Sequence, residues 1–174
     1  YDLLGDAIVS GDTVDSSILG TYIITYNITD SNGNVADKVT RTVIVQDTTL
    51  PVISLTGDST IYVEYEELYT ENGATFTDNY DTSGDAIVGG DTVDTSILGT
   101  YTVTYNITDT NSNEAIEVTR TVIVQDTTLP VISLIGDSTV YVEYEESYTE
   151  NGATFTDNYD ASGDAVIGGD TVNS

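Results

Sequence analysis

Apolar and polar residues alternate with a period of two along much of the chain. Residues 100–109 read Thr-Tyr-Thr-Val-Thr-Tyr-Asn-Ile-Thr-Asp, so that every second side chain is apolar. Alternation of β-branched and aromatic residues with threonine is typical of a half-buried antiparallel strand. We therefore expect one face of this strand, formed by Tyr101, Val103, Tyr105 and Ile107, to point into a core.

The same alternation predicts a series of further strands. Residues 117–124 repeat it, with Arg120 at an inward position among valines. Other strands are expected at 52–55, 61–65, 74–77, 86–88 and 92–97. No stretch places apolar residues at helical spacing, and Gly, Asn or Asp interrupts the pattern about every eight to twelve residues. Six or seven short strands in succession favour a sandwich of two sheets.

The chain also repeats itself. Residues 47–55, Asp-Thr-Thr-Leu-Pro-Val-Ile-Ser-Leu, return at 126–134, an offset of 79 residues. Tyr1 aligns in the same way with Tyr80 and Tyr159. A fixed period of this size is the signature of a tandem array, which builds length from one stacked unit.

Four motifs in this order carry a family resemblance. They are Asp-Thr-Thr-x-Pro-Val-Ile, Asn-Gly-Ala-Thr-Phe-Thr-Asp-Asn-Tyr-Asp, Leu-Gly-Thr-Tyr-Thr-Val-Thr-Tyr-Asn-Ile-Thr-Asp and Thr-Arg-Thr-Val-Ile-Val-Gln-Asp. Together they resemble the bacterial immunoglobulin-like repeats of pesticidal-crystal-type toxins and surface proteins, and more distantly the hyaline repeat. The resemblance implies an all-β fold of tandem immunoglobulin-like β-sandwich repeats of 79 residues.

The resemblance also implies the phase of the repeat. Residues 1–46 would be the carboxy-terminal half of one repeat, 47–125 a complete repeat and 126–174 the amino-terminal half of another. In a second phase, each domain would run from about residue 1 to residue 77, leaving residues from 159 onward as an extra strand. In the first phase the incomplete end repeats are expected to find their missing strands in a neighbour, either along a continuous polymer or in a second chain.

The amino-acid composition excludes several classes of binding partner and of catalytic chemistry. Three Lys and Arg residues against 30 Asp and Glu residues give a net charge of −27, which excludes nucleic acid and anionic membranes as partners. The chain has no Cys and no His, so thiolate metal sites and the commonest general base are excluded. No apolar run is long enough to span a membrane. Acidic pairs that recur in each copy favour a structural role, so we expect no enzymatic activity.

Acidic residues are expected to gather at the two poles of the complete repeat. The amino-terminal group comprises Asp47, Glu66, Glu67 and Asp109. The opposite group comprises Asp58, Asp78 and Asp81, facing Asp126, Glu145 and Glu146 of the next repeat. Oxygen-only clusters suit calcium, which would stiffen the joint between repeats. The alternative is a solvated acidic surface with diffuse counterions.

Two short motifs are candidates for metal binding and for glycosylation. Residues 30–34 and 109–113 resemble the first ligands of an EF-hand loop, but position six lacks Gly and position twelve is Arg41 or Arg120. A hairpin turn explains these segments better. The sequons at Asn27 and Asn106 are candidate glycosylation sites on an outward strand face.

These observations predict the structural shaft of an extracellular or cell-surface bacterial filament, stalk or adhesin. Its partners would be neighbouring copies of the same repeat, head to tail, in a homopolymer or fibre. One alternative is an adhesive module that binds polysaccharide or a host surface, for which the candidate aromatics are Tyr62, Tyr69 and Tyr80. Another is a spacer domain of a secreted enzyme or toxin.

Overall fold

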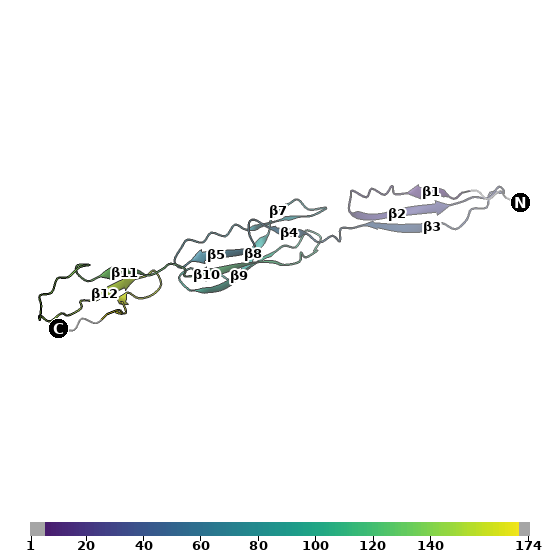
Figure 1. The fold of residues 1–174 in the computed structure, drawn as a ribbon. Helices are drawn as coiled ribbons and strands as arrows, with labels where there is room; N and C mark the ends of the chain where they lie inside the picture. The colour runs from purple at the N-terminus through teal and green to yellow at the C-terminus, as the bar shows by residue number, and fades with distance from the viewer. Residues whose placement is uncertain (1–5, 171–174) are drawn as a thin grey trace.

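The computed structural model describes residues 6–170, and all regular structure in that range is β (Figure 1). Its strands are β1 (Ile8–Gly11), β2 (Gly20–Asn27), β3 (Val39–Val45), β4 (Val52–Leu55), β5 (Thr60–Glu64), β6 (Ala74–Thr77), β7 (Gly84–Asp85), β8 (Ile87–Gly90), β9 (Gly99–Asn106), β10 (Val118–Gln125), β11 (Val131–Leu134), β12 (Ala153–Thr156) and β13 (Gly163–Asp164). Across this described range, no helix has the length and apolar character needed to cross a membrane.

The middle of the chain forms a two-sheet sandwich. One sheet has the order β5-β10-β9-β8 and the other the order β4-β6-β7. The pair β5 and β10 is parallel, with Thr60 opposite Thr121 and Glu64 opposite Gln125, whereas the other pairs in these two sheets are antiparallel. This arrangement confirms the all-β, immunoglobulin-like fold that the sequence predicts.

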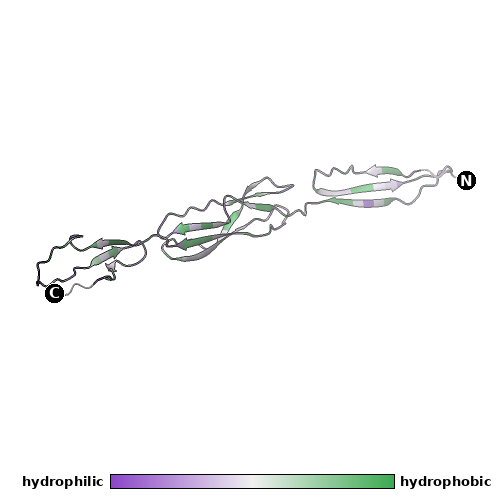
Figure 2. Ribbon diagram, in the orientation of Figure 1, coloured by the Kyte–Doolittle hydropathy of each residue, from purple (hydrophilic) through white to green (hydrophobic). Residues whose placement is uncertain are grey.

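The core of the sandwich comes from the inward positions of the alternating pattern. Val103 and Tyr105 of β9 and Val122 of β10 are at most 3% exposed. They pack with Val63 of β5, in the same sheet, and with Ile53 of β4, in the other sheet. Figure 2 shows hydrophobic stretches on the strands of this middle unit, as on those of the sheets at either end of the molecule. The predicted inward faces are therefore confirmed, because the period of two directs alternate side chains to opposite faces.

Arg120 is the exception within this core. It lies on β10, between β5 and β9, and is fully buried. The guanidinium forms a salt bridge with Glu71, whose carboxylate also accepts hydrogen bonds from the hydroxyls of Tyr69 and Tyr105. The structure confirms the inward position of Arg120 that the alternation predicts. Its carboxylate partner is 49 residues away in sequence, and β10 is a central strand, since β5 pairs with its outer side.

Arg120 also donates hydrogen bonds to three backbone carbonyl oxygens. Its Nε donates to the carbonyl of Asp58 at 3.0 Å, and its Nη2 donates to the carbonyls of Thr56 at 2.7 Å and Gly73 at 3.4 Å. A buried charge with a carboxylate and several carbonyl partners is tolerated in a protein interior, because each of its three nitrogens has an acceptor.

A smaller sheet flanks the sandwich on each side. The sheet β1-β2-β3 precedes it and the sheet β11-β12-β13 follows it, and the two lie at opposite ends of an extended molecule (Figure 1). Strands β1, β2 and β3 are the 79-residue equivalents of β8, β9 and β10, and β11, β12 and β13 are those of β4, β6 and β7. Each flanking sheet thus corresponds to one part of the middle sandwich.

One predicted strand differs from the structure. Residues 92–97, predicted as a strand, contain a turn in which the Asp94 carboxylate accepts hydrogen bonds from the backbone NH and hydroxyl of Ser96. The buried apolar residues of the described chain lie between Ile53 and Val124.

Candidate metal centre

Three aspartates from separate segments meet at the amino-terminal pole of the middle sandwich. Asp47 lies in the linker after β3, Asp78 follows β6, and Asp109 lies in the turn between β9 and β10. One carboxylate oxygen from each residue lies within 4.8 Å of the other two. We refer to Asp47, Asp78 and Asp109 as the junction triad.

The position of Asp109 results from a tight hairpin turn. Thr108 and Glu114 form an isolated antiparallel bridge, which confirms the hairpin predicted for this segment. Within the turn, Asp109 Oδ1 accepts hydrogen bonds from the backbone NH groups of Asn111, at 2.9 Å, and Asn113, at 2.7 Å. Side-chain capping of this kind fixes the carboxylate with respect to its own backbone.

Asp47 connects the linker to the same turn. Its Oδ1 accepts a hydrogen bond from the backbone NH of Thr49 at 3.1 Å, and its Oδ2 accepts one from the amide of Asn111 at 3.2 Å. Asp47 is only 9% exposed, although it belongs to a linker. The linker is therefore anchored on the sandwich that follows it.

Asp78 contributes an oxygen without a hydrogen-bond partner. Its Oδ2 accepts hydrogen bonds from the backbone NH groups of Tyr80, at 2.9 Å, and Asp81, at 3.0 Å, which lower the pKa of Asp78. Its Oδ1 is buried from solvent and accepts no hydrogen bond. An ionised oxygen in this state is costly unless a cation or another donor satisfies it.

No basic side chain neutralises the triad within residues 6–170. The single salt bridge of that range joins Arg120 and Glu71 in the core. Calcium binds oxygen ligands at about 2.3 to 2.6 Å, so ligand oxygens around one ion lie within about 5 Å of each other. The spacing and the oxygen-only chemistry of the triad fit such an ion.

The next junction repeats part of this arrangement. Asp126 and Asp157 are the 79-residue equivalents of Asp47 and Asp78, and Oδ1 of Asp157 is again buried without a hydrogen-bond partner. Burial and the neighbouring carboxylates of Glu64 and Asp157 raise the pKa of Asp126. The same unsatisfied oxygen thus recurs at both junctions.

Glu64, at the end of β5, fastens the middle sandwich to the linker that follows. Its Oε1 accepts hydrogen bonds from the backbone NH groups of Thr127, at 2.8 Å, and Thr128, at 3.1 Å. Its Oε2 accepts one from the hydroxyl of Thr127 at 2.8 Å. The backbone and hydroxyl donors of Thr127 and Thr128 lower the pKa of Glu64 to about 2. Close by, the rings of Tyr65 and Tyr159 meet edge to face, with their centroids 5.0 Å apart.

The structure groups the predicted acidic residues differently from the sequence. Asp47 and Asp109 do lie together, but Glu66 and Glu67 do not join them. The backbone NH of Glu66 donates to the carbonyl of Thr95, and the preceding Tyr65 donates to Gln125, at the far end of β10. The reason is the parallel pairing of β5 with β10, which carries the end of β5 to the carboxy-terminal pole.

The second predicted group is also divided. Asp78 and Asp81 lie at the amino-terminal pole, where Asp81 accepts hydrogen bonds from the backbone NH and hydroxyl of Thr110. Asp58 instead presents its carbonyl to Arg120. Glu145 and Glu146 lie in a turn of the last unit, where the backbone NH of Glu146 donates to the carbonyl of Glu143.

One non-local signal in the sequence could have placed Asp78 correctly. Strand β4 begins shortly after Asp47, and its antiparallel partner β6 ends with Thr77 opposite Val52. The residue after β6 therefore lies beside the linker that precedes β4. Recognising the two matching runs as neighbours in one sheet would have brought Asp78 next to Asp47.

The other candidate residues have clear positions. Asn27 and Asn106 end β2 and β9, and the Oδ1 of each accepts a hydrogen bond from the next backbone NH at 2.8 Å. Of the three candidate aromatics for glycan binding, Tyr62 is 65% and Tyr80 is 50% exposed. Tyr69 is half-buried and donates to Glu71, so it belongs to the core network.

A further feature typical of immunoglobulin-like sandwiches is the anchoring of Tyr101. Its hydroxyl donates to the carbonyls of Asp94, at 2.9 Å, and Ile97, at 3.0 Å, seven and four residues upstream. Tyr22 makes the equivalent contacts with Asp15 and Ile18. The two sheets, their core and this tyrosine corner define an immunoglobulin-like β-sandwich domain.

Comparison with known proteins gives the family. The family model described as "Bacterial surface protein, Ig-like domain" matches residues 1–45 and 53–124, and the chain belongs to this family. The chain is also 36% identical over 183 residues to hyalin of Strongylocentrotus purpuratus, a match that covers 95% of the chain and 15% of hyalin. An uncharacterized 81.3 kDa protein of Acholeplasma phage L2 is 29% identical over 154 residues, covering 84% of the chain and 20% of that protein. The chain thus spans a fifth or less of the length of these relatives.

Proposed function

We propose that this chain is a non-catalytic structural repeat of an extracellular bacterial shaft, stalk or adhesin, and that calcium stiffens the junctions between its repeats. The family of bacterial surface domains and the similarity to hyalin support a surface location. Successive units aligned along an extended molecule support a role in making length (Figure 1).

The junction triad is the observation that carries the calcium proposal. Asp47 belongs to the linker, whereas Asp78 and Asp109 belong to the sandwich. An ion bound by all three would fix the direction in which the linker leaves the sandwich. The Oδ1 of Asp78 is buried and has no hydrogen-bond partner, and no described basic side chain reaches the triad. A bound cation would therefore satisfy this oxygen.

Glu64 supports a stiff junction as well, because it lies on the sandwich that precedes a linker, whereas the triad lies on the sandwich that follows one. It holds Thr127 and Thr128 of the following linker through backbone and hydroxyl donors. A linker fastened to the preceding sandwich by Glu64, and to the following sandwich by the equivalents of the triad, leaves little freedom at the joint. Such a joint transmits load along the shaft.

The test is thermal unfolding of the chain in 1 mM EDTA and in calcium, with magnesium as a second ion. We expect calcium to raise the melting temperature of the middle sandwich, because an ion that binds only the folded state stabilises it. Magnesium should act more weakly, since it requires a smaller octahedral site. Identical melting curves in EDTA and calcium would contradict the calcium proposal.

A further inference from the structure

The turn that holds Asp109 carries two further side chains suited to calcium. Residues 109–113, Asp-Thr-Asn-Ser-Asn, have the spacing of the first three ligands of an EF-hand loop but lack the Gly and Glu that complete one. The structure places this turn at the amino-terminal pole of the middle sandwich, where Asp109 belongs to the junction triad. Ligands that the turn itself lacks can therefore come from other segments of the fold.

Both asparagines of the turn contact the carboxylates of the triad. The amide nitrogen of Asn111 donates to Oδ2 of Asp47 at 3.2 Å. The amide nitrogen of Asn113 donates to Oδ2 of Asp109 at 2.7 Å and to the main-chain carbonyl of Asp47 at 3.4 Å. Two neutral amides thus hold the linker and the turn together in the absence of a cation.

The turn residues themselves fix the positions of these amides. Oδ1 of Asp109 accepts the backbone NH of both asparagines, and Ser112 between them has a left-handed φ of 72°. The turn at 30–34 contains the same hydrogen bonds, and there Asn34 donates to Oδ2 of Asp30 at 2.7 Å. Because two different turn sequences share this arrangement, it arises locally and is present before a linker or an ion binds.

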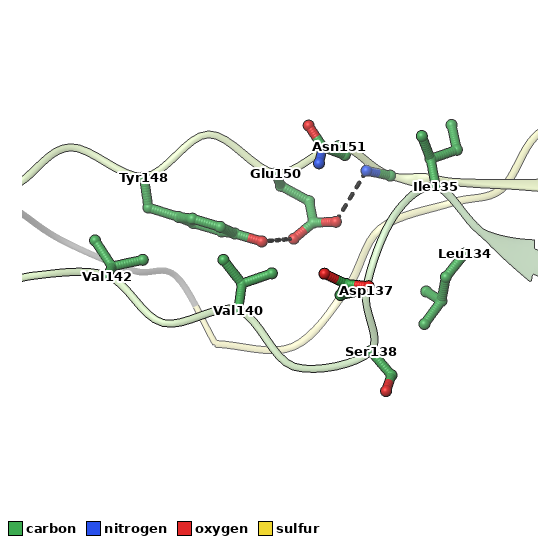
Figure 3. Close-up of a pocket in the computed structure, with 10 residues that line it drawn as sticks. Leu134, Ile135, Asp137, Ser138, Val140, Val142, Tyr148, Glu150 and Asn151 are labelled. Atoms are coloured by element: carbon green, nitrogen blue, oxygen red, sulfur yellow. Dashed lines mark hydrogen bonds between the residues drawn. The ribbon is translucent and has the colours of Figure 1, made fainter.

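The third aspartate of the triad has an oxygen that no donor satisfies. Oδ1 of Asp78 is buried from solvent without a hydrogen-bond partner, a state that among the described residues recurs only at its equivalent, Asp157. A carboxylate in a hollow need not be left in this state. Glu150, in the last unit, accepts hydrogen bonds from the hydroxyl of Tyr148 and the backbone NH of Gly152 (Figure 3). The donors of the turn therefore leave one buried oxygen of the triad in need of a cation.

An asparagine amide can serve the triad with or without an ion. Its oxygen and nitrogen have similar sizes, so a half-turn about the Cβ–Cγ bond exchanges a donor for an acceptor without requiring more space. After this rotation, the three carboxylates and the two amides offer five protein oxygens in total. Water molecules bring that number to the six to eight oxygens that calcium takes.

We propose that Asn111 and Asn113 are calcium ligands of the junction triad, and that their amides turn from nitrogen donors into oxygen ligands when the ion binds. The proposal rests on the calcium junction of the proposed function and names the residues that complete that site. The linker is docked on the sandwich both with and without the ion, because the same residues hold it in both states. Calcium therefore stiffens a joint that is already formed.

Calorimetric titration of calcium into chains freed of metal with EDTA tests the ligand role. Asn113→Leu removes both the oxygen and the donor, and we expect the calcium affinity to fall at least about tenfold, since even residues behind the ligands contribute that much in metal sites. Asn111→Leu should have an effect of the same size. Asn113→Asp keeps an oxygen and adds a charge, so its calcium affinity should equal or exceed that of the wild-type chain.

The matched controls are Asn72→Leu and Asn72→Asp. They make the same changes at an exposed residue of the loop that precedes β6, away from the triad. Both should bind calcium as the wild-type chain does. Equal losses of affinity at Asn72 and at Asn113 would overturn the ligand assignment, because they would show an effect of the substitutions in general.

Thermal unfolding separates a ligand from a residue that only donates hydrogen bonds. In EDTA, Asn113→Asp should melt below the wild-type chain, because a carboxylate replaces the donor to Asp47 and Asp109. In calcium the variant should recover, so that its rise in melting temperature exceeds that of the wild-type chain. A structural role alone would lower both melting temperatures equally, and that result would refute the proposal.

A second measurement needs no substitution. The Cγ carbon resonances of Asn111 and Asn113 should move downfield on calcium binding, because the ion withdraws electron density from a coordinated amide oxygen. Resonances that stay in place while the wild-type chain binds calcium would overturn the ligand assignment and leave the calcium junction standing. A wild-type chain that binds no calcium would overturn both, so the two failures are distinguishable.

Discussion

Arg120 and Glu71 form a salt bridge across 49 residues of sequence in the core of the middle sandwich. The Arg120 side chain is fully buried, and that of Glu71 is 22% exposed. Burial raises the pKa of Glu71, but hydrogen bonds from Tyr105, Tyr69 and the Gly73 NH, together with the charge of Arg120, outweigh it, so that the pKa is lowered overall. The pair links the four-stranded sheet to the loop that precedes β6.

Replacing Arg120 should therefore destabilise the sandwich strongly. We expect Arg120→Met to lower the free energy of unfolding by about 3 to 5 kcal/mol, because it leaves the Glu71 carboxylate without its buried cation. Urea denaturation followed by circular dichroism measures this change. The matched control is Arg41→Met at the equivalent, exposed position, which should change stability by less than about 0.5 kcal/mol in the monomer. Similar losses in the two variants would contradict a special role for the buried pair.

The junction triad makes a prediction under two conditions. Without calcium, Asp78→Asn should change the melting temperature little, because the charge that it removes from the acidic cluster is one that the backbone NH groups of Tyr80 and Asp81 stabilise in the folded state. In calcium the same variant should lose the stabilisation seen in the wild-type chain. Differential scanning calorimetry under both conditions measures the two effects.

Glu67→Gln is the matched control for that experiment. The sequence groups Glu67 with Asp47, but the structure places it at the opposite pole, beside Glu64. Its response to calcium should therefore equal that of the wild-type chain. Loss of the calcium effect in Glu67→Gln with retention in Asp78→Asn would support the sequence-based grouping instead.

Acid should release the linker that follows the middle sandwich. The pKa of Glu64 is lowered from 4.5 to about 2 by the donors of Thr127 and Thr128. A lowered pKa in the folded state means that the stabilisation is complete above the unfolded-state value and is lost as the pH falls towards about 2. We expect protection of the Thr127 and Thr128 amides to decline between about pH 4.5 and 2, as measured by NMR hydrogen exchange. Glu64→Gln should remove this pH dependence, and an unchanged profile in that variant would show that another group is responsible.

The tyrosine corner should contribute measurably to stability. Tyr101→Phe removes the hydroxyl that donates to the carbonyls of Asp94 and Ile97, and we expect a loss of about 1 kcal/mol in the free energy of unfolding. Tyr62→Phe, at a position 65% exposed on β5, should have almost no effect. Chemical denaturation of both variants measures the two free energies of unfolding. Equal losses in the two variants would contradict a stabilising role for the tyrosine corner.

The strands and their inward faces were predictable because the relevant signal is local. Alternation across Tyr101, Val103 and Tyr105 fixes which side chains share a face, whatever the strand pairs with. The position that holds Leu68 in one copy holds Ser147 in the next, which favours an exposed site because a buried Ser without a partner is costly, and Leu68 is 90% exposed. The hairpin that positions Asp109 followed from its turn residues.

The composition of the junction triad was not predictable from those local signals. Grouping Glu66 with Asp109 required β5 to run antiparallel to its neighbour, and it runs parallel to β10 instead. The direction of a pairing between segments about sixty residues apart depends on packing and chain connection, which the alternation of side chains does not encode.

The sequence alone therefore determined the β-strands, their core-facing residues, the 79-residue period and the immunoglobulin-like family, since all of these reside in neighbouring residues or in direct self-similarity. Only the tertiary structure decided which carboxylates meet and that Arg120 lies at the centre of a core. The physical reason is that hydrogen bonding between strands and the burial of charge depend on partners that are distant in sequence.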